Sequence, residues 1–147
     1  MRNTIIGSLL LGIIASGCSG GEEMPYVFSS EVSKKLSELS QKGPQGATVL
    51  LSDVTPFQWD EVHIFPQSSS GKIINRNVGQ KMFDDNALYG ESGALMVFTD
   101  HDKIIHALSF APPLYFDTGK KFTYSPSEAV VVAHTKDPGP YTLSIKE

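Results

Sequence analysis

The chain has 147 residues, a formal net charge of −4 and a single cysteine. Its length fits one ordinary domain that can bury a core of its own. Lysines are scattered singly and leave no basic stripe of the kind that contact with phosphate backbones requires, which excludes nucleic acid as a partner. One cysteine also excludes an internal disulfide and a structural zinc–thiolate site.

The first 17 residues have the three parts of an export signal. Arg2 is the charged end, an apolar run extends from Ile5 to Ile14, and small residues follow at positions 15–17. The run is shorter than the about 20 residues that cross a bilayer as a helix, so we expect residues 1–17 to be removed. The alternatives are an ordinary secretory signal or a buried helix that happens to contain a cysteine.

The segment Ala15-Ser16-Gly17-Cys18 resembles the lipobox of bacterial lipoproteins, with Ala15 where leucine is usual. The resemblance implies that Cys18 is acylated and becomes the first residue of the mature protein. Two or three acyl chains hold a protein stably on a membrane, because each buried methylene contributes about 0.8 kcal/mol. We expect residues 18–28 to form a flexible tether. Serine after the cysteine implies the periplasmic face of the outer membrane if the host is Gram-negative.

The segment from Ser29 to Lys42 predicts an amphipathic helix. Val32, Leu36 and Leu39 recur at spacings of four and three, which makes one apolar stripe, and Gly43-Pro44 ends the pattern. We expect the stripe to pack on a sheet. A surface helix that binds a partner is the alternative.

The rest of the chain alternates short apolar runs with Gly, Pro, Asp and Asn. Candidate strands are Ala47–Ser52, Trp59–Phe65, Ala94–Thr99, Ile104–Phe110, Ala129–His134 and Tyr141–Ile145. A short second helix is possible over Lys72–Gly79, and the turn at Asp100–Lys103 predicts an antiparallel hairpin. The expected fold is a single α+β domain over residues 29–147, with an N-terminal amphipathic helix packed on a mainly antiparallel sheet of about five to six strands.

The most distinctive stretch extends from Pro56 to Pro66. As a strand it places aromatic and polar side chains together on each face. One face has Phe57, Trp59, Glu61, His63 and Phe65, and the other has Gln58, Asp60, Val62 and Ile64. Either one face lines a pocket with polar groups at its edge, or the aromatic side chains are buried and the charges lie at the strand ends. We favour the buried arrangement, because aromatic side chains dominate small cores.

This stretch resembles a Trp-Asp-x-Val-x-x-Phe strand of small uncharacterised bacterial envelope lipoproteins. Trp59 and Asp60 are its most characteristic positions, with Val62 and Phe65 following at the same spacing. Gln67-Ser68-Ser69-Ser70 departs from the Pro-Tyr step that is common in that group. The resemblance implies no known activity.

Other polar groups carry no strong motif for chemistry. Asp100, His101, Asp102 and His106 are close in sequence, but a turn explains them better than a metal site, because strand alternation separates their side chains. Ser69 and Lys72 have the spacing of penicillin-binding enzymes, yet the companion Ser-Asp-Asn and Lys-Thr-Gly elements are missing from the sequence. We expect no cofactor and no metal.

Three functional hypotheses remain open. The first is a non-enzymatic lipoprotein, tethered by Cys18, that binds a protein or envelope component; an immunity lipoprotein against a periplasmic toxin is one form of it. The second is a small envelope hydrolase that uses His63 with Asp60 or Glu61, which requires these side chains to converge in one cleft. The third is small-ligand binding by the Trp59 face, which requires a pocket.

Overall fold

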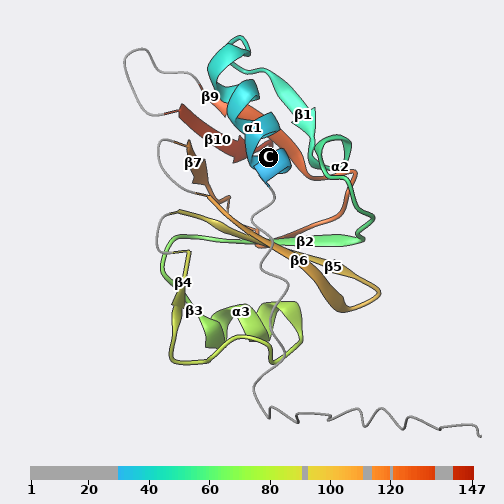
Figure 1. Cartoon of the computed structure of the whole chain (residues 1–147), viewed down its shortest axis with the longest axis vertical. Helices are drawn as coiled ribbons and strands as arrows, with labels where there is room; N and C mark the ends of the chain where they lie inside the picture. The colour runs from blue at the N-terminus through green and yellow to red at the C-terminus, as the bar shows by residue number, and fades with distance from the viewer. Residues whose placement is uncertain (1–29, 91–92, 111–113, 120, 135–140) are drawn as a thin grey trace, which may run out of the picture.

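The computed structural model describes residues 30–90, 93–110, 114–119, 121–134 and 141–147 (Figure 1). The predicted signal segment, Cys18 and the tether lie outside the described residues. Within those described ranges, no helix combines the length and the apolar character needed to cross a bilayer.

The described chain is mostly β, so the expected α+β fold is wrong. Its helices are α1 (Ser30–Lys42), α2 (Leu51–Val54) and α3 (Gly71–Val78). Its ten strands are β1 (Thr48–Leu50), β2 (Glu61–Phe65), β3 (Ser69–Ser70), β4 (Leu88–Tyr89), β5 (Leu95–Asp100), β6 (Lys103–Ser109), β7 (Leu114–Asp117), β8 (Thr123–Tyr124), β9 (Val130–His134) and β10 (Tyr141–Ile145).

These strands form three sheets in place of the single sheet of five to six strands that was expected. Sheet A has the order β1-β9-β10-β7, sheet B has the order β6-β5-β2-β8, and β3 pairs with β4 alone. Every pair is antiparallel except β7 with β10, which is parallel. The expectation failed because several strands have only two to four residues, too few for an apolar alternation to be visible in the sequence.

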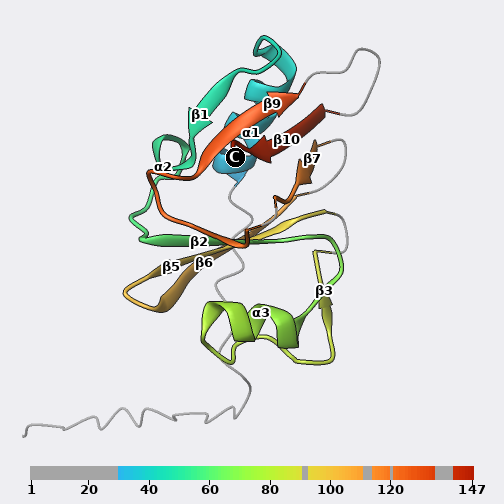
Figure 2. The same cartoon turned by 180° about the vertical axis from the view of Figure 1, so that it is seen from behind.

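Helix α1 carries the apolar stripe that its spacing predicts, but its support differs from the expected one. Val32 and Leu36 are fully buried, and the Gly43 N–H donates to the Leu39 carbonyl at 3.0 Å where the helix ends. The helix contacts β9 and β10 of the four-stranded sheet A. Figure 1 shows α1 in front of these strands, and Figure 2 shows the strands in front of the helix.

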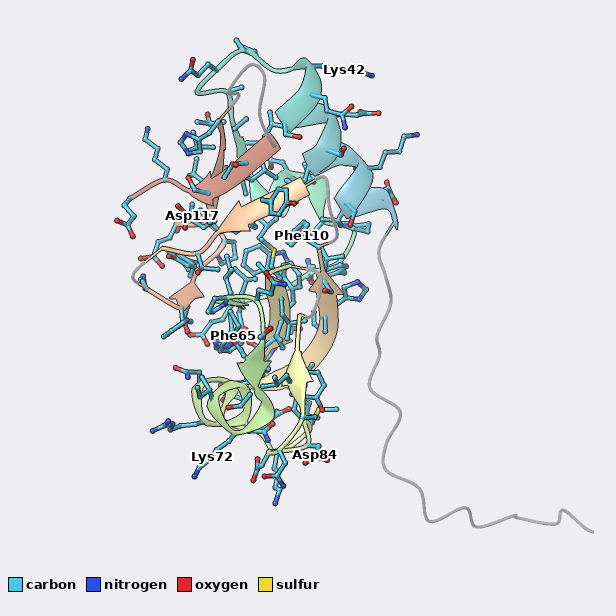
Figure 3. The ribbon with its side chains drawn as sticks, turned by 90° about the vertical axis from the view of Figure 1, so that its left-hand side faces the viewer. Lys42, Phe65, Lys72, Asp84, Phe110 and Asp117 are labelled. Atoms are coloured by element: carbon cyan, nitrogen blue, oxygen red, sulfur yellow. The ribbon has the colours of Figure 1, made fainter. Side chains whose placement is uncertain are left out.

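Sheet B lies between two hydrophobic cores. The main core joins α1, α2, sheet A and one face of sheet B, to which β2 contributes Val62 and Ile64. The second core lies between the other face and α3, and β2 contributes Phe65 to it. Figure 3 shows this order along the molecule, from Lys42 at the end of α1, through Phe110 and Phe65, to Lys72 beside α3.

Helix α3 is fixed at both ends and in its middle. The Ser70 hydroxyl accepts from the Ile73 N–H, and Gly79 ends the helix with φ of 79°, a left-handed conformation that glycine adopts without steric cost. Asn75, buried in the middle of the helix, donates to the Phe83 carbonyl at 2.7 Å and accepts from the N–H groups of Met82 and Phe83. The loop after the helix is therefore tied to it.

Candidate functional site

Trp59 precedes β2 and is largely buried, with 7% of its surface exposed. Its ring meets the Phe98 ring edge-on at a centroid distance of 5.3 Å, and its Nε1–H donates to Thr55 Oγ1 at 2.8 Å. Phe65, at the other end of the strand, is fully buried. The aromatic side chains of this stretch are buried, as favoured, but the predicted shared face is wrong, because Trp59 belongs to the main core and Phe65 to the second core.

Asp60 connects the start of β2 to the turn of the β5–β6 hairpin. Its N–H donates to the Thr99 carbonyl at 2.9 Å, and its Oδ2 accepts from the His101 N–H at 2.8 Å. His101 and Asp102 form the turn with φ of 50° and 62°, so an anchoring acceptor helps to hold a backbone that L-residues rarely adopt. The predicted hairpin is confirmed, and Asp60 holds its turn.

His63 lies inside the molecule with 3% of its surface exposed. Its Nδ1 shares a hydrogen bond of 2.9 Å with Thr123 Oγ1 of the neighbouring strand β8. Its Nε2 is 3.6 Å from Glu61 Oε2, which is beyond hydrogen-bond distance. Burial lowers the pKa of His63, and the charge of Asp60 opposes that shift.

The hydrolase hypothesis requires His63 and a carboxylate to meet in an open cleft. Glu61 does lie near the imidazole, but the imidazole is closed to solvent, and the Asp60 carboxylate is directed at the hairpin turn. A general base must come within hydrogen-bond reach of the proton that it removes from a substrate. His63 has no such access in this structure.

A pocket of about 330 Å³ opens beside Trp59, as the hypothesis of a binding face requires. It is lined by Ser52, Phe57, Gln58, Trp59 and Asp100. The Phe57 ring is held in place by Phe98, 5.1 Å away and edge-on, and by the His106 ring, 4.5 Å away. The pocket thus combines two aromatic side chains with one carboxylate from the hairpin.

Three polar side chains gather next to this pocket. The ligand atoms of Asp60, Asp100 and His101 lie within 4.8 Å of one another, and such oxygen and nitrogen donors could contribute to a divalent cation site. The turn already explains their placement, because Asp60 binds the His101 N–H and His101 Nδ1 lies 3.0 Å from Asp100 Oδ1. His106, grouped with them by sequence, instead packs on Phe57. We assign no metal to these residues.

Sequence reasoning missed Ser52 as a wall of the pocket. Ser52 comes from α2, a one-turn helix in a segment expected to be a strand. Strand alternation had already placed Phe57 on the same face as Trp59, and both residues line the pocket. Comparison with protein-family models, with curated proteins and with solved structures finds no match for this chain.

Proposed function

We propose that this chain is a lipoprotein of the cell envelope, tethered to a membrane through Cys18, whose domain binds a protein or another envelope component without transforming it. The observation that carries the tether is the sequence of Arg2, an apolar run, small residues and the sole cysteine. Helix α1 begins at Ser30, twelve residues after Cys18. Twelve extended residues span at most about 40 Å, so the domain works close to the lipid surface.

Binding is better supported than catalysis by the site geometry. The two residues best suited to catalysis stabilise the fold instead, because His63 is buried and the Asp60 carboxylate holds a turn. The open feature is the Trp59 pocket, whose aromatic walls and Asp100 carboxylate suit a lysine or arginine side chain of a partner protein. A basic periplasmic toxin, neutralised by an immunity lipoprotein, is one partner of this chemistry.

The tether is tested by Cys18→Ser in the expressing bacterium. The variant loses the thiol to which lipid is added, so we expect loss of labelling by a palmitate analogue and release of the protein from the membrane fraction. Ser19→Ala is the matched control and keeps the label. Membrane retention of the unlabelled Cys18→Ser protein would show that the anchor is not this lipid.

The binding surface is tested with a photo-crosslinking amino acid at Gln58, an exposed residue of the pocket wall. Irradiation of living cells should give one discrete adduct, which Asp100→Ala weakens. Gln45, exposed on the segment between α1 and β1, is the control position and should give none. Equal adduct patterns at both positions would rule out the pocket as the binding surface, and a toxin encoded beside this chain would identify the immunity form.

A further inference from the structure

The outer face of helix α3 presents two cations and an aliphatic side chain to solvent. We call α3, β3, β4 and the loop between α3 and β4 (residues 69–89) the α3 layer. Lys72 and Arg76 are four positions apart, and Ile73 lies three positions before Arg76. All three are exposed, so they share the face of the helix opposite to its buried side chains.

Leu88 adds a second exposed aliphatic side chain beside the first turn of α3. It pairs across β3 and β4 with Ser70, the N-cap of the helix. The next residue, Tyr89, is directed at the second core, where its ring meets the Phe83 ring edge-on at 4.7 Å, so strand alternation directs Leu88 away from that core. Leu88 is 56% exposed and Ile73 is 39% exposed, and the other exposed large hydrophobic side chains of the described residues are aromatic.

The α3 layer differs in the sign of its charge from the rest of the domain. It contains two lysines, one arginine and two carboxylates, whereas the remaining described residues contain six lysines and ten side-chain carboxylates. Both carboxylates of the layer have interactions within it, since Asp85 Oδ2 lies 4.0 Å from Lys81 Nζ and Asp84 Oδ1 accepts a backbone N–H. Neither Lys72 nor Arg76 forms an ion pair with another described residue.

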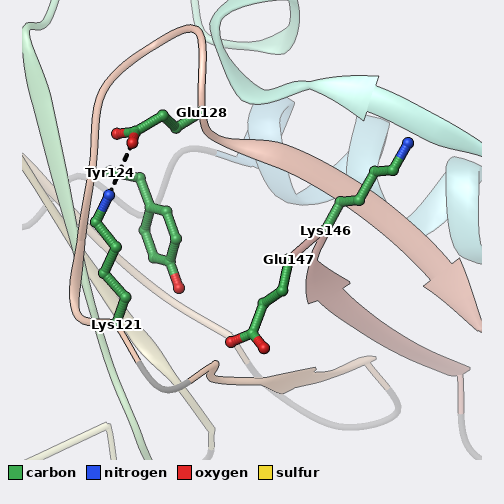
Figure 4. Close-up of a pocket in the computed structure, with 5 residues that line it drawn as sticks. All are labelled: Lys121, Tyr124, Glu128, Lys146 and Glu147. Atoms are coloured by element: carbon green, nitrogen blue, oxygen red, sulfur yellow. Dashed lines mark hydrogen bonds and ion pairs between the residues drawn. The ribbon is translucent and has the colours of Figure 1, made fainter.

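A second group of lysines, beside Tyr124, shows the contrast. Two lysines and two glutamates line a pocket of about 490 Å³ there, together with the tyrosine (Figure 4). Lys121 Nζ donates to Glu128 Oε1 at 2.8 Å, so this cation is already neutralised. The cations on α3 have no such partner and remain available to an anionic surface.

The tether joins the domain at the end of α1 that is nearer to the α3 layer. Figure 3 shows Lys42, the last residue of α1, at one end of the molecule and Lys72 pointing outward at the other. In Figures 1 and 2 the start of α1 lies closer to sheet B than its end does. The twelve residues from Cys18 to Ser30 span at most about 40 Å, more than the combined thickness of sheet B and α3, each about 10 Å. The membrane that holds the lipid can therefore lie directly against α3.

We propose that the outer face of the α3 layer docks on an anionic lipid surface, the membrane that holds the lipid of Cys18, an inference that rests on the proposed tether. The negative surface potential of anionic lipids attracts Lys72 and Arg76, and the two aliphatic side chains enter the boundary between headgroups and acyl chains. The tether keeps this face at a high effective concentration beside the bilayer, so a small patch is enough to orient the domain. Because α3 covers the face of sheet B opposite to the main core, to which Trp59 belongs, docking leaves the Trp59 pocket open to a partner.

The test uses the full-length protein, purified from the expressing bacterium, in vesicles of phosphatidylglycerol and phosphatidylethanolamine in equal parts. An environment-sensitive fluorescent amino acid replaces Asn77, on the exposed face of α3, or Gln45, beyond the far end of α1. Nitroxide-labelled lipids should quench the probe at position 77 about threefold more than the probe at position 45, because only the former lies at the lipid surface.

Charge and apolar contact are then tested separately. Lys72→Gln combined with Arg76→Gln should lower the quenching at position 77 toward the value at position 45, and vesicles of phosphatidylcholine alone should do the same, because the attraction between charges is lost. Leu88→Ser should also lower it, because an apolar contact is lost. Lys34→Gln combined with Lys42→Gln removes two exposed lysines of α1 and is the matched control, which should leave the quenching unchanged.

The docking surface is overturned if the probes at positions 77 and 45 are quenched equally, or if the double substitution on α3 changes nothing. A blue shift of the position 77 probe in native membranes that is absent in vesicles would also overturn it, because a protein and not lipid would then cover this face. Mass spectrometry of the same sample detects the acyl chains: their absence contradicts the tether, whereas the quenching decides the docking surface. Photo-crosslinking at Gln58 should be unaffected by the substitutions on α3, which separates this test from that of the proposed partner.

Discussion

At the scale of single residues, side chains that suggest chemistry in the sequence prove to hold the fold. Trp59 is packed against Phe98, Asp60 accepts a hydrogen bond from the hairpin turn, and His63 is buried and hydrogen-bonded to Thr123. Asp60 and Trp59 each make a hydrogen bond within the fold, and His63 makes one through Nδ1. A polar residue type therefore indicates a site only when its functional atom remains open to solvent.

The burial of His63 predicts a stability that depends on pH. Its pKa in the folded protein is below 6.5, the value expected for the unfolded chain, so the unfolded chain binds more protons as the pH falls below that value. Stability should be fully present above about pH 6.5 and should decrease below it; His106, whose pKa burial also lowers, acts in the same direction. Urea denaturation at pH 7.5 and 5.5 measures the difference.

His63→Gln should reduce that difference, because glutamine does not titrate. His134→Gln, at an exposed position of β9, is the control and should retain the wild-type difference. An unchanged pH dependence in His63→Gln would show that His63 is not the group responsible.

At the scale of elements, α3 depends on one buried amide. The helix covers the second core, yet half of its eight residues are polar, and only Ile74 and Val78 contribute buried apolar side chains from within it. Asn75 adds stabilising hydrogen bonds to this limited apolar packing. Its side-chain oxygen accepts from the N–H groups of Met82 and Phe83, and its nitrogen donates to the Phe83 carbonyl and, at 2.9 Å, to Asp85 Oδ1. Helix and loop thus form one unit.

We predict that Asn75→Ala lowers the free energy of unfolding by about 2–4 kcal/mol, because it leaves buried N–H and carbonyl groups of the loop unpaired. Asn77→Ala is the matched control two residues away. Asn77 is exposed and donates only to the Ile73 carbonyl within the helix, so its loss should change stability by less than about 0.5 kcal/mol. Urea denaturation of both variants measures this, and equal effects would contradict the role of Asn75.

At the scale of the whole molecule, two cores of unequal size flank sheet B. Among the described residues, the main core contains nineteen buried hydrophobic side chains and the second core contains seven. Of those seven, only Ile74, Val78 and Phe83 come from outside sheet B. The α3 layer is therefore held by less apolar burial than the layer that contains α1 and sheet A.

Unequal burial predicts that the α3 layer opens before the rest of the fold. Native-state hydrogen exchange should give a lower opening free energy for the amides of α3 than for those of β5, β9 and β10. Phe83→Leu should lower the value for α3 and spare β9, whereas Phe110→Leu, in the main core, should lower both. A single opening free energy shared by α3 and β9 would show that the two layers unfold together.

The sequence by itself determined the local features whose cause is local. The apolar spacing of Val32, Leu36 and Leu39 specifies α1, Gly79 ends α3, and the Asp-rich turn joins β5 to β6. Cys18, as the sole cysteine, remains the basis of the proposed tether. Helices and tight hairpins depend on residues within a few positions of one another, so they can be predicted from the sequence alone.

Only the tertiary structure decided the sheet order and the Trp59 pocket. Strand β1 pairs with β9, β2 pairs with both β5 and β8, and β7 runs parallel to β10, and none of these pairings follows from sequence neighbourhood. The Trp59 pocket needs Asp100 from a distant hairpin. Such contacts arise when the chain buries apolar surface as a whole. The sequence of a short strand has too few residues to identify the strand with which it pairs.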